Sequence, residues 1–178
     1  MRILPTILYA SAHCLALCAV PAAAQLPTPP MSSAPSQAQS YLFYGGAGDV
    51  FEITSSMIAL QKSQNPQLRA FASMLIDHHT RLTNGALDTA KSAGVMAPPP
   101  ELSTEQKAMI RQLIAASPAT FDRTFIDQQI MAHQQALTLQ SGYASGGDVP
   151  ALRQAAQGAI PTVQEHLAQA QQMRGLLR

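Results

Sequence analysis

The sequence contains no tryptophan, and only 5% of its residues are aromatic and 12% charged. Its two cysteines, Cys14 and Cys18, both lie in an N-terminal segment that we expect to be removed. The remaining chain would therefore have no disulfide, thiolate ligand or nucleophilic cysteine. The sequence has no run of alternating β-branched residues that would predict a sheet. A helical hydrophobic core therefore has to stabilise the fold.

The N-terminus has the three parts of a secretory signal. Arg2 precedes an apolar stretch over residues 3–20, and small residues follow over 21–24. This pattern predicts a signal peptide at residues 1–24, with cleavage after Ala24. The apolar stretch is short for a membrane span and no stop-transfer pattern follows it, so a retained anchor is only the alternative. We therefore expect a periplasmic or secreted protein with no membrane span after cleavage.

The charge of the mature chain is balanced. The full sequence has 11 basic and 10 acidic residues, and loss of Arg2 leaves ten of each. A neutral chain has no electrostatic basis for binding nucleic acid, so we expect no nucleic-acid partner. Residues 25–39 are rich in Pro, Ser and Gln and are predicted to be a disordered leader. Residues 40–178 then form one domain, which is long enough for a real core.

Proline, glycine and capping residues mark the ends of the predicted helices in this domain. Pro66 follows a turn at Asn65, Gly94 ends the next segment, and Pro118 and Pro150 each open another. Ser103 and Gln106 fit a capping box of a short helix in the connector. The pattern predicts an all-α, antiparallel four-helix bundle with a short extra helix between the second and third long helices. The long helices are expected at about residues 39–63, 66–93, 118–145 and 150–178.

Three of the long helices carry one histidine in an otherwise apolar seam. His79, His133 and His166 fall on lines of residues spaced by three and four, each on a different helix. The first helix is less regular. Its apolar line is Val50, Ile53, Met57 and Leu60, whereas Glu52 lies on a neighbouring line with the small residues Gly45, Gly48, Ser56 and Ala59.

Positions along the helices predict that these polar residues meet. Glu52 and His79 lie 14 and 13 residues from Pro66, or about 20 Å at 1.5 Å per residue. His133 and His166 lie roughly 21 and 24 Å from the turn between the last two helices. An up-down-up-down bundle would place both turns at one end and all four side chains at one level.

This convergence predicts a metal site formed by Glu52, His79, His133 and His166. Imidazole and carboxylate ligands suit one divalent Zn, Cu, Fe or Ni ion. The alternative is a non-enzymatic structural or stress-related envelope module, in which the histidines form a buried hydrogen-bond network. A metal-dependent oxidoreductase is a further alternative. No arrangement supports a covalent hydrolase, and the sequence leaves open whether the protein is an enzyme, with a binding role favoured.

Residues 41–173 resemble the secreted bacterial DUF4142 family, which has a ferritin-like four-helix fold. The resemblance rests on Glu52 and on the segments 65–72, 74–80, 121–123, 127–133 and 161–167. It implies the fold and an exported location, but no activity. The histidines that recur in the family correspond to His79, His133 and His166. His78 stands where the family more often has an acidic residue, so we expect His78 to be a solvated flanking residue.

The same resemblance limits the kind of metal centre. Di-iron members of the ferritin-like group use Glu-x-x-His on two helices, with a further Glu from each of the others. The residues three positions before His79 and His166 are Ile76 and Val163. With Glu52 the only carboxylate at the predicted level, a classical di-iron site is not expected.

Overall fold

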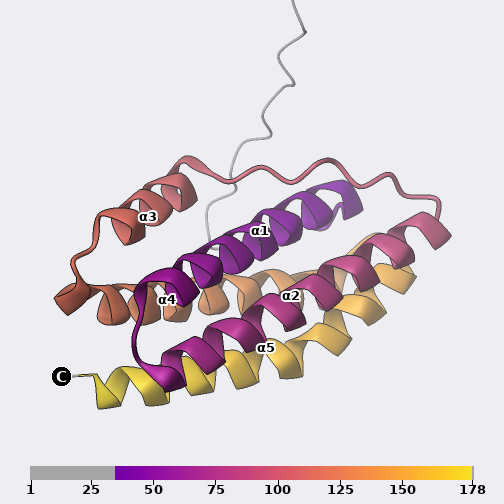
Figure 1. Cartoon of the computed structure of the whole chain (residues 1–178). Coiled ribbons are helices and arrows are strands. Elements are labelled where there is room, and N and C mark those ends of the chain that lie inside the picture. Colours follow the sequence, from indigo (N-terminus) through magenta and orange to yellow (C-terminus); the bar gives the residue numbers. More distant parts are fainter. Residues whose placement is uncertain (1–34, 178) are drawn as a thin grey trace, which may run out of the picture.

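The computed structural model describes residues 35–177, which form five helices and no strand in that range. The predicted signal peptide and most of the predicted leader lie outside the described residues. The predicted fold class is confirmed: four long helices pack together, with a short helix in the connector (Figure 1). The helices are α1 (Ala38–Lys62), α2 (Pro66–Ser92), α3 (Thr104–Ala115), α4 (Pro118–Gly146) and α5 (Pro150–Leu176).

The predicted capping residues begin and end these helices. The Asn65 side chain accepts hydrogen bonds from the backbone N–H groups of Gln67 and Leu68, so it caps α2. Ser103 and Gln106 form both hydrogen bonds of the capping box that starts α3. Gly94 takes a left-handed φ of 71° just after α2, where a residue with a Cβ would be strained.

The four long helices pack so that each contacts two others closely. Helix α1 packs against α2 and α4, and α5 packs against α4 and α2. The connector after α2 runs back along the bundle, and α3 then packs on α1 and α4 (Figure 1). Each of the four neighbouring pairs of long helices is antiparallel, as predicted for the bundle.

The expected chain path was wrong in one respect. The backbone N–H of Ala38, at the start of α1, donates to Asp148 in the turn between α4 and α5, at 2.9 Å. That turn therefore lies at the opposite end of the bundle from the turn at Pro66, because the connector crosses the full length of the bundle before α4 begins (Figure 1). The histidines still meet, since His133 lies near the middle of α4 and its height is similar from either end.

The buried face of α1 also differs from its apolar line. Met57 is 53% exposed, whereas Glu52, Ser56 and Ala59 are buried. Ser56 and Ala59 of the small-residue line face the interior beside the buried Phe51, whereas Gly45 and Gly48 are half-buried and, among the described residues, no neighbouring atom lies close to the Cβ position of Gly48. Glu52 is buried as a consequence.

The apolar core has two separate clusters. One surrounds Phe71 and Phe125 toward the Pro66 turn, and the other surrounds Tyr41 and Tyr143 toward the opposite end. The two tyrosine rings stack with centroids 4.0 Å apart. Along α2, α4 and α5, each buried histidine lies between residues of the first cluster and residues of the second, so a polar layer divides the interior of the bundle.

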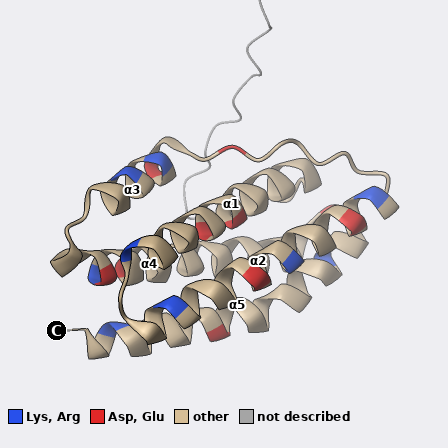
Figure 2. Cartoon of the chain, viewed as in Figure 1, with Lys and Arg blue, Asp and Glu red and all other residues tan. Residues whose placement is uncertain are grey.

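The charges on the described residues do not gather on one helix. Basic and acidic residues are interspersed along the bundle in the view of Figure 2. Among the described helices, none has the length and apolar character that a membrane crossing requires.

Lys62, at the end of α1, holds the C-terminus of α3. Its Nζ donates to the carbonyl oxygens of Leu113 (3.1 Å), Ile114 (2.6 Å) and Ala116 (2.8 Å), and it lies 5.4 Å from the centroid of the Phe121 ring. These carbonyls lie at the C-terminal end of α3, where the next turn of helix is missing; that of Leu113 also accepts from the Ala116 N–H at 3.3 Å. A cation at this end also stabilises the helix dipole. This ammonium holds the C-terminus of α3 to the bundle, in addition to the buried Leu113 side chain and the hydrogen bonds of Gln128 to Met109 and Gln112.

We predict that Lys62→Met lowers the free energy of unfolding by about 1–3 kcal/mol, because three carbonyls, two of them in part-buried hydrogen bonds, lose a charged donor. Urea denaturation measures this loss, and amide hydrogen exchange should accelerate most in α3. Lys91→Met, at the exposed end of α2, is the matched control and should change the stability by less than about 1 kcal/mol. Equal effects of the two substitutions would contradict the assigned role of Lys62.

Candidate metal centre

Three histidines from three helices meet in the polar layer. His79 of α2, His133 of α4 and His166 of α5 are all buried, and one ring nitrogen of each lies within 4.8 Å of the others. His133 Nε2 and His166 Nδ1 are 3.2 Å apart. Two tetrahedral ligands placed about 2.0 Å from one ion would be roughly 3.3 Å apart, so this pair has the spacing that a metal ion needs.

His79 is held from its outer side by α1. Its Nδ1 lies 2.8 Å from Asp49 Oδ1, and the Thr83 hydroxyl donates to the other carboxylate oxygen at 2.5 Å. Because the carboxylate only accepts, the proton of the neutral His79 ring sits on Nδ1. The lone pair of Nε2 then faces the other histidines, and this buried atom has no partner in the protein.

His133 is oriented by its own helix. Its Nδ1 donates to the Gln129 carbonyl at 2.8 Å, so its Nε2 also carries a lone pair. Glu52 lies on the same outer side, with Oε1 3.6 Å from Nδ1 of His133. The Gln129 amide donates to the Ser55 hydroxyl, which donates to the Glu52 carbonyl. Helices α1 and α4 are thus joined behind His133.

His166 lies between two other imidazoles. Its Nδ1 faces His133, and its Nε2 lies 2.8 Å from Nδ1 of His78. The planes of the His78 and His166 rings differ by 22° and their centroids are 5.1 Å apart, so the two rings meet edge to edge through these nitrogens. His78 is half-buried and part of this chain of rings, so the expectation of a solvated flanking residue was wrong.

Burial sets the protonation of the site. Burial, with the charge of His79, lowers the pKa of His133 to about 4. Burial, with the charges of His133 and His79, lowers the pKa of His166 to about 3. Burial also lowers the pKa of His79, but the hydrogen bond to Asp49 and the charge of Glu52 outweigh it and raise this pKa. Burial raises the pKa of Glu52 to about 8.

Several buried polar atoms in this layer have no hydrogen-bond partner. Besides His79 Nε2, these are Glu52 Oε2, Ser56 Oγ and Gln129 Oε1. An unpaired buried polar atom costs about 1–3 kcal/mol. A cation held by the three imidazoles would give His79 Nε2 a partner, so the donor set fits a metal ion.

The structure brings together three of the four predicted site residues. His79, His133 and His166 form one group of candidate ligands, as the seams predicted. Glu52 is buried at the same level but approaches the outer nitrogen of His133, outside that group. The metal-binding role of all four residues stays a prediction.

Asp49 was missed by the sequence reasoning, although a signal existed. Asp49 and Glu52 are three residues apart, so they share a face of α1. Asp49 lies 17 residues before Pro66, and Thr83 lies 17 residues after it. The height argument applied to Glu52 would therefore have placed Asp49 beside Thr83 and one turn from His79.

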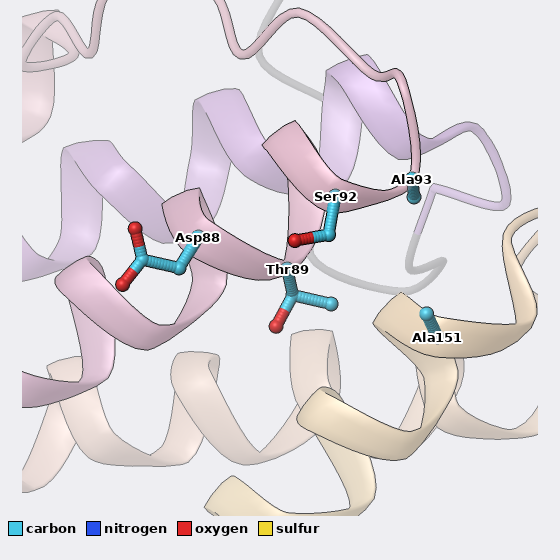
Figure 3. A pocket seen from close by; sticks show the side chains of 5 residues that line it. All are labelled: Asp88, Thr89, Ser92, Ala93 and Ala151. Carbon is cyan, nitrogen blue, oxygen red and sulfur yellow. The ribbon is translucent and has the colours of Figure 1, made fainter.

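A pocket among the described residues lies away from the histidines. It is an open hollow at the end of α2 and the start of α5, lined by small and polar side chains (Figure 3). Asp88 is nine residues beyond His79, about 14 Å along α2. This pocket is separate from the metal centre. Its lining residues are Asp88, Thr89, Ser92, Ala93 and Ala151.

Comparison with known families identifies the group to which the protein is related. A family model described as a domain of unknown function, DUF4142, matches residues 21–173. The chain belongs to the DUF4142 family. This confirms the resemblance that the sequence motifs indicated. Among proteins of curated function, none matches the chain.

Solved structures share the fold of this DUF4142 protein. The chain is similar to CopM in the Cu(II)-bound form, with 21% identity and a TM-score of 0.67 over 80% of this chain and 98% of CopM. CopM in the Ag-bound form matches at 22% identity and a TM-score of 0.63 over 77% and 94% of the two chains. A DUF305 fragment from Deinococcus radiodurans matches at 17% identity and a TM-score of 0.70 over 82% and 99%. At these identities the likeness establishes the helical fold alone.

We predict that Glu52→Gln makes the stability of the metal-free protein rise more steeply with pH between about 4.5 and 6.5. In this range Glu52 stays protonated when folded (pKa about 8) and ionises when unfolded, so it lowers stability as pH rises. His133 and His166 act in the opposite direction, because only the unfolded chain takes up their protons. Removing Glu52 should steepen the curve by about 1.4 kcal/mol per pH unit.

Urea denaturation at several pH values, in the presence of a chelator, measures this slope. Glu165→Gln, an exposed change beside His166, is the control and should leave the curve parallel to that of the unmodified protein. A parallel curve for Glu52→Gln would show that Glu52 is ionised in the folded chain and would contradict the assigned pKa.

Proposed function

We propose that this protein is an exported helical-bundle protein that binds one transition-metal ion through His79, His133 and His166. One observation carries the proposal: a ring nitrogen of each histidine lies in a buried group within 4.8 Å. The outer nitrogens of His79 and His133 are tied to acceptors, which leaves lone pairs on their inner nitrogens. Histidines that bind metals are oriented in this way by a carboxylate or a backbone carbonyl.

Copper is the ion that we place first. Three neutral imidazoles suit Zn, Cu, Fe and Ni, and among the divalent ions an N-donor site binds Cu²⁺ most strongly. CopM, which has the same fold, has been solved with Cu(I), Cu(II) and Ag bound. We extend this chemistry to the present chain as a proposal, with Zn²⁺ as the competing ion.

Glu52 acts in this proposal as the outer partner of His133. Its Oε1 lies 3.6 Å from the outer Nδ1, whereas the candidate ligand atom of His133 is Nε2. Glu52 and Asp49 also bring acidic groups close to an otherwise neutral set of ligands. Either carboxylate, when ionised, would offset part of the charge of a bound cation.

The hydrogen-bonded chain of rings favours a second candidate function. His78, His166 and His133 form a continuous series of contacts that ends on the Gln129 carbonyl. In a structural or stress-related envelope module, this network would itself complete the polar layer without a metal. The histidines would then contribute to stability, and an outer face of the bundle would recruit a partner protein.

We predict that the purified protein, produced without a histidine tag, binds close to one equivalent of copper. His133→Asn and His166→Asn should each weaken binding by more than about 100-fold, because loss of a ligand costs more than loss of an outer partner. Competition titration against a chelator and elemental analysis measure this. Gln134→Ala, exposed and next to His133, is the control and should bind normally.

Metal content and stability together separate the two candidate functions. Ligand binding stabilises the folded state by mass action, so the metal should raise the Tm of the unmodified protein but not of the two variants. If no ion binds and the variants only lose stability, the metal proposal is wrong and the structural network is supported.

We further propose export, from the signal pattern of residues 1–24. When the full chain is expressed in a bacterium, the mature protein should begin at Gln25 and lie in the periplasm or the medium. Intact mass and N-terminal sequencing of the fractionated protein check this. Replacement of Ala22 and Ala24 by Leu should block cleavage, whereas recovery of the intact chain from the cytoplasm without these changes would contradict export.

A further inference from the structure

The protons of two site histidines are fixed by groups that can only accept. The Asp49 carboxylate accepts a hydrogen bond from Nδ1–H of His79, and the Gln129 carbonyl accepts one from Nδ1–H of His133. In its neutral form each ring therefore has the lone pair on Nε2, the nitrogen that is not hydrogen-bonded to Asp49 or Gln129. These tautomers already suit a bound cation and need no change.

His166 differs because both of its nitrogens face other imidazoles. Its Nδ1 lies 3.2 Å from His133 Nε2, which has only a lone pair and must accept. A hydrogen bond at this contact requires the proton of His166 to sit on Nδ1. His166 Nε2 then has to accept from Nδ1–H of His78, 2.8 Å away. Each of the three rings is neutral in this arrangement, and all three hydrogen bonds, including the one to Gln129, run in one direction.

In this arrangement one candidate ligand atom, Nδ1 of His166, cannot bind a metal ion. The nitrogen of His166 that faces the other ligands is Nδ1, and in the metal-free chain it carries the proton. For Nδ1 to become a ligand while the ring stays neutral, the proton has to be carried on Nε2 instead. Nε2–H then needs an acceptor, and the atom in position is Nδ1 of His78.

We propose that His78 is the positioning residue that lets His166 bind a metal through Nδ1, by exchanging its tautomer together with that of His166. The proposal rests on the proposed metal-binding function. On binding, His166 changes from Nδ1–H to Nε2–H, and His78 changes likewise. His78 Nδ1 turns from donor to acceptor, and the hydrogen bond between the rings reverses.

The protons balance in this exchange. Each ring carries one N–H before and after, so neither ring changes its charge. His133 and His166 are completely buried, whereas His78 is half-buried and can exchange protons with water. The Nδ1 proton of His78 passes to Nε2 of His166, and water supplies a proton to Nε2 of His78. The proton displaced from Nδ1 of His166 leaves to water that accompanies the incoming ion, so the number of protons on the pair is unchanged.

The charged residues next to His78 and His166 do not alter the tautomers assigned to these two rings. Asp77 and Glu165 adjoin His78 and His166 in sequence but are exposed. Asp77 pairs with Arg81, and Glu165 accepts from Gln169. The direct contact of His166 Nε2 that the structure gives is therefore with His78, which is the group to vary.

Two substitutions separate the hydrogen bond of His78 from the presence of an aromatic ring at this position. His78→Phe keeps an aromatic ring beside His166 but removes the acceptor. His78→Gln removes the ring but keeps a side chain that can donate or accept. Asp77→Asn is the exposed control next to it. Circular dichroism and the Tm of the metal-free forms establish that each variant is folded.

The test uses ¹⁵N-labelled mature protein at pH 7.5, with Ag⁺ as a diamagnetic probe in chloride-free buffer. Long-range ¹H–¹⁵N NMR spectra report which nitrogen of each ring carries the proton. We expect Nδ1–H on His166 and His78 without metal, and Nε2–H on both after one equivalent of Ag⁺. His78→Phe should weaken binding about 10- to 100-fold, the usual effect of losing an outer partner. His78→Gln should bind within about threefold of the unmodified protein, and Asp77→Asn should match it.

The outcomes distinguish this inference from the proposed function. Nε2–H on His166 in the metal-free protein would overturn the inference whether or not an ion binds. Ag⁺ binding with unchanged tautomers, or with normal affinity in His78→Phe, would overturn the inference and leave the metal site in place. No uptake of Ag⁺ or copper by the unmodified protein would remove both.

Discussion

The structure depends on the need to satisfy a layer of polar groups buried between two apolar clusters. Apolar packing at both ends of the bundle excludes water from the middle, where each imidazole and carboxylate needs a partner. Asp49, Gln129 and Ser55 meet much of this need, and they do so by tying α1 to α2 and α4. The contacts that satisfy this layer are also the contacts that orient the candidate ligands.

Sequence periodicity predicted the helices and the three histidines because both follow from local rules. A histidine in an apolar seam faces inward wherever the seam does. The convergence of His79 and His133 could therefore be predicted without knowing their hydrogen-bond partners. The path of the chain was harder to predict, since a long connector permits either direction for α4. The buried face of α1 was misjudged because Glu52 and Ser56 face the interior while Met57 is exposed, an orientation that hydrophobicity alone does not predict. The place of His78 in the site could be recognised only from the structure, because it depends on the contact of His78 with His166 of α5.

Membership of the DUF4142 family and the likeness to CopM and a DUF305 fragment place this chain among helical bundles of related architecture. The architecture alone does not specify an activity, since one fold hosts many sites. What marks this chain is the environment of its histidines. Two have outer partners that accept only, and the third, His166, contacts another imidazole on each side.

The position of the histidines halfway along the helices has a kinetic consequence. The site is roughly 20 Å from the Pro66 end, and the aromatic pair Tyr41 and Tyr143 closes the interior toward the other end. An ion bound by these histidines would therefore have to pass between helices, and the half-buried His78, which contacts His166, lies between α2 and α5. Entry and release on this side would depend on how far those two helices can separate.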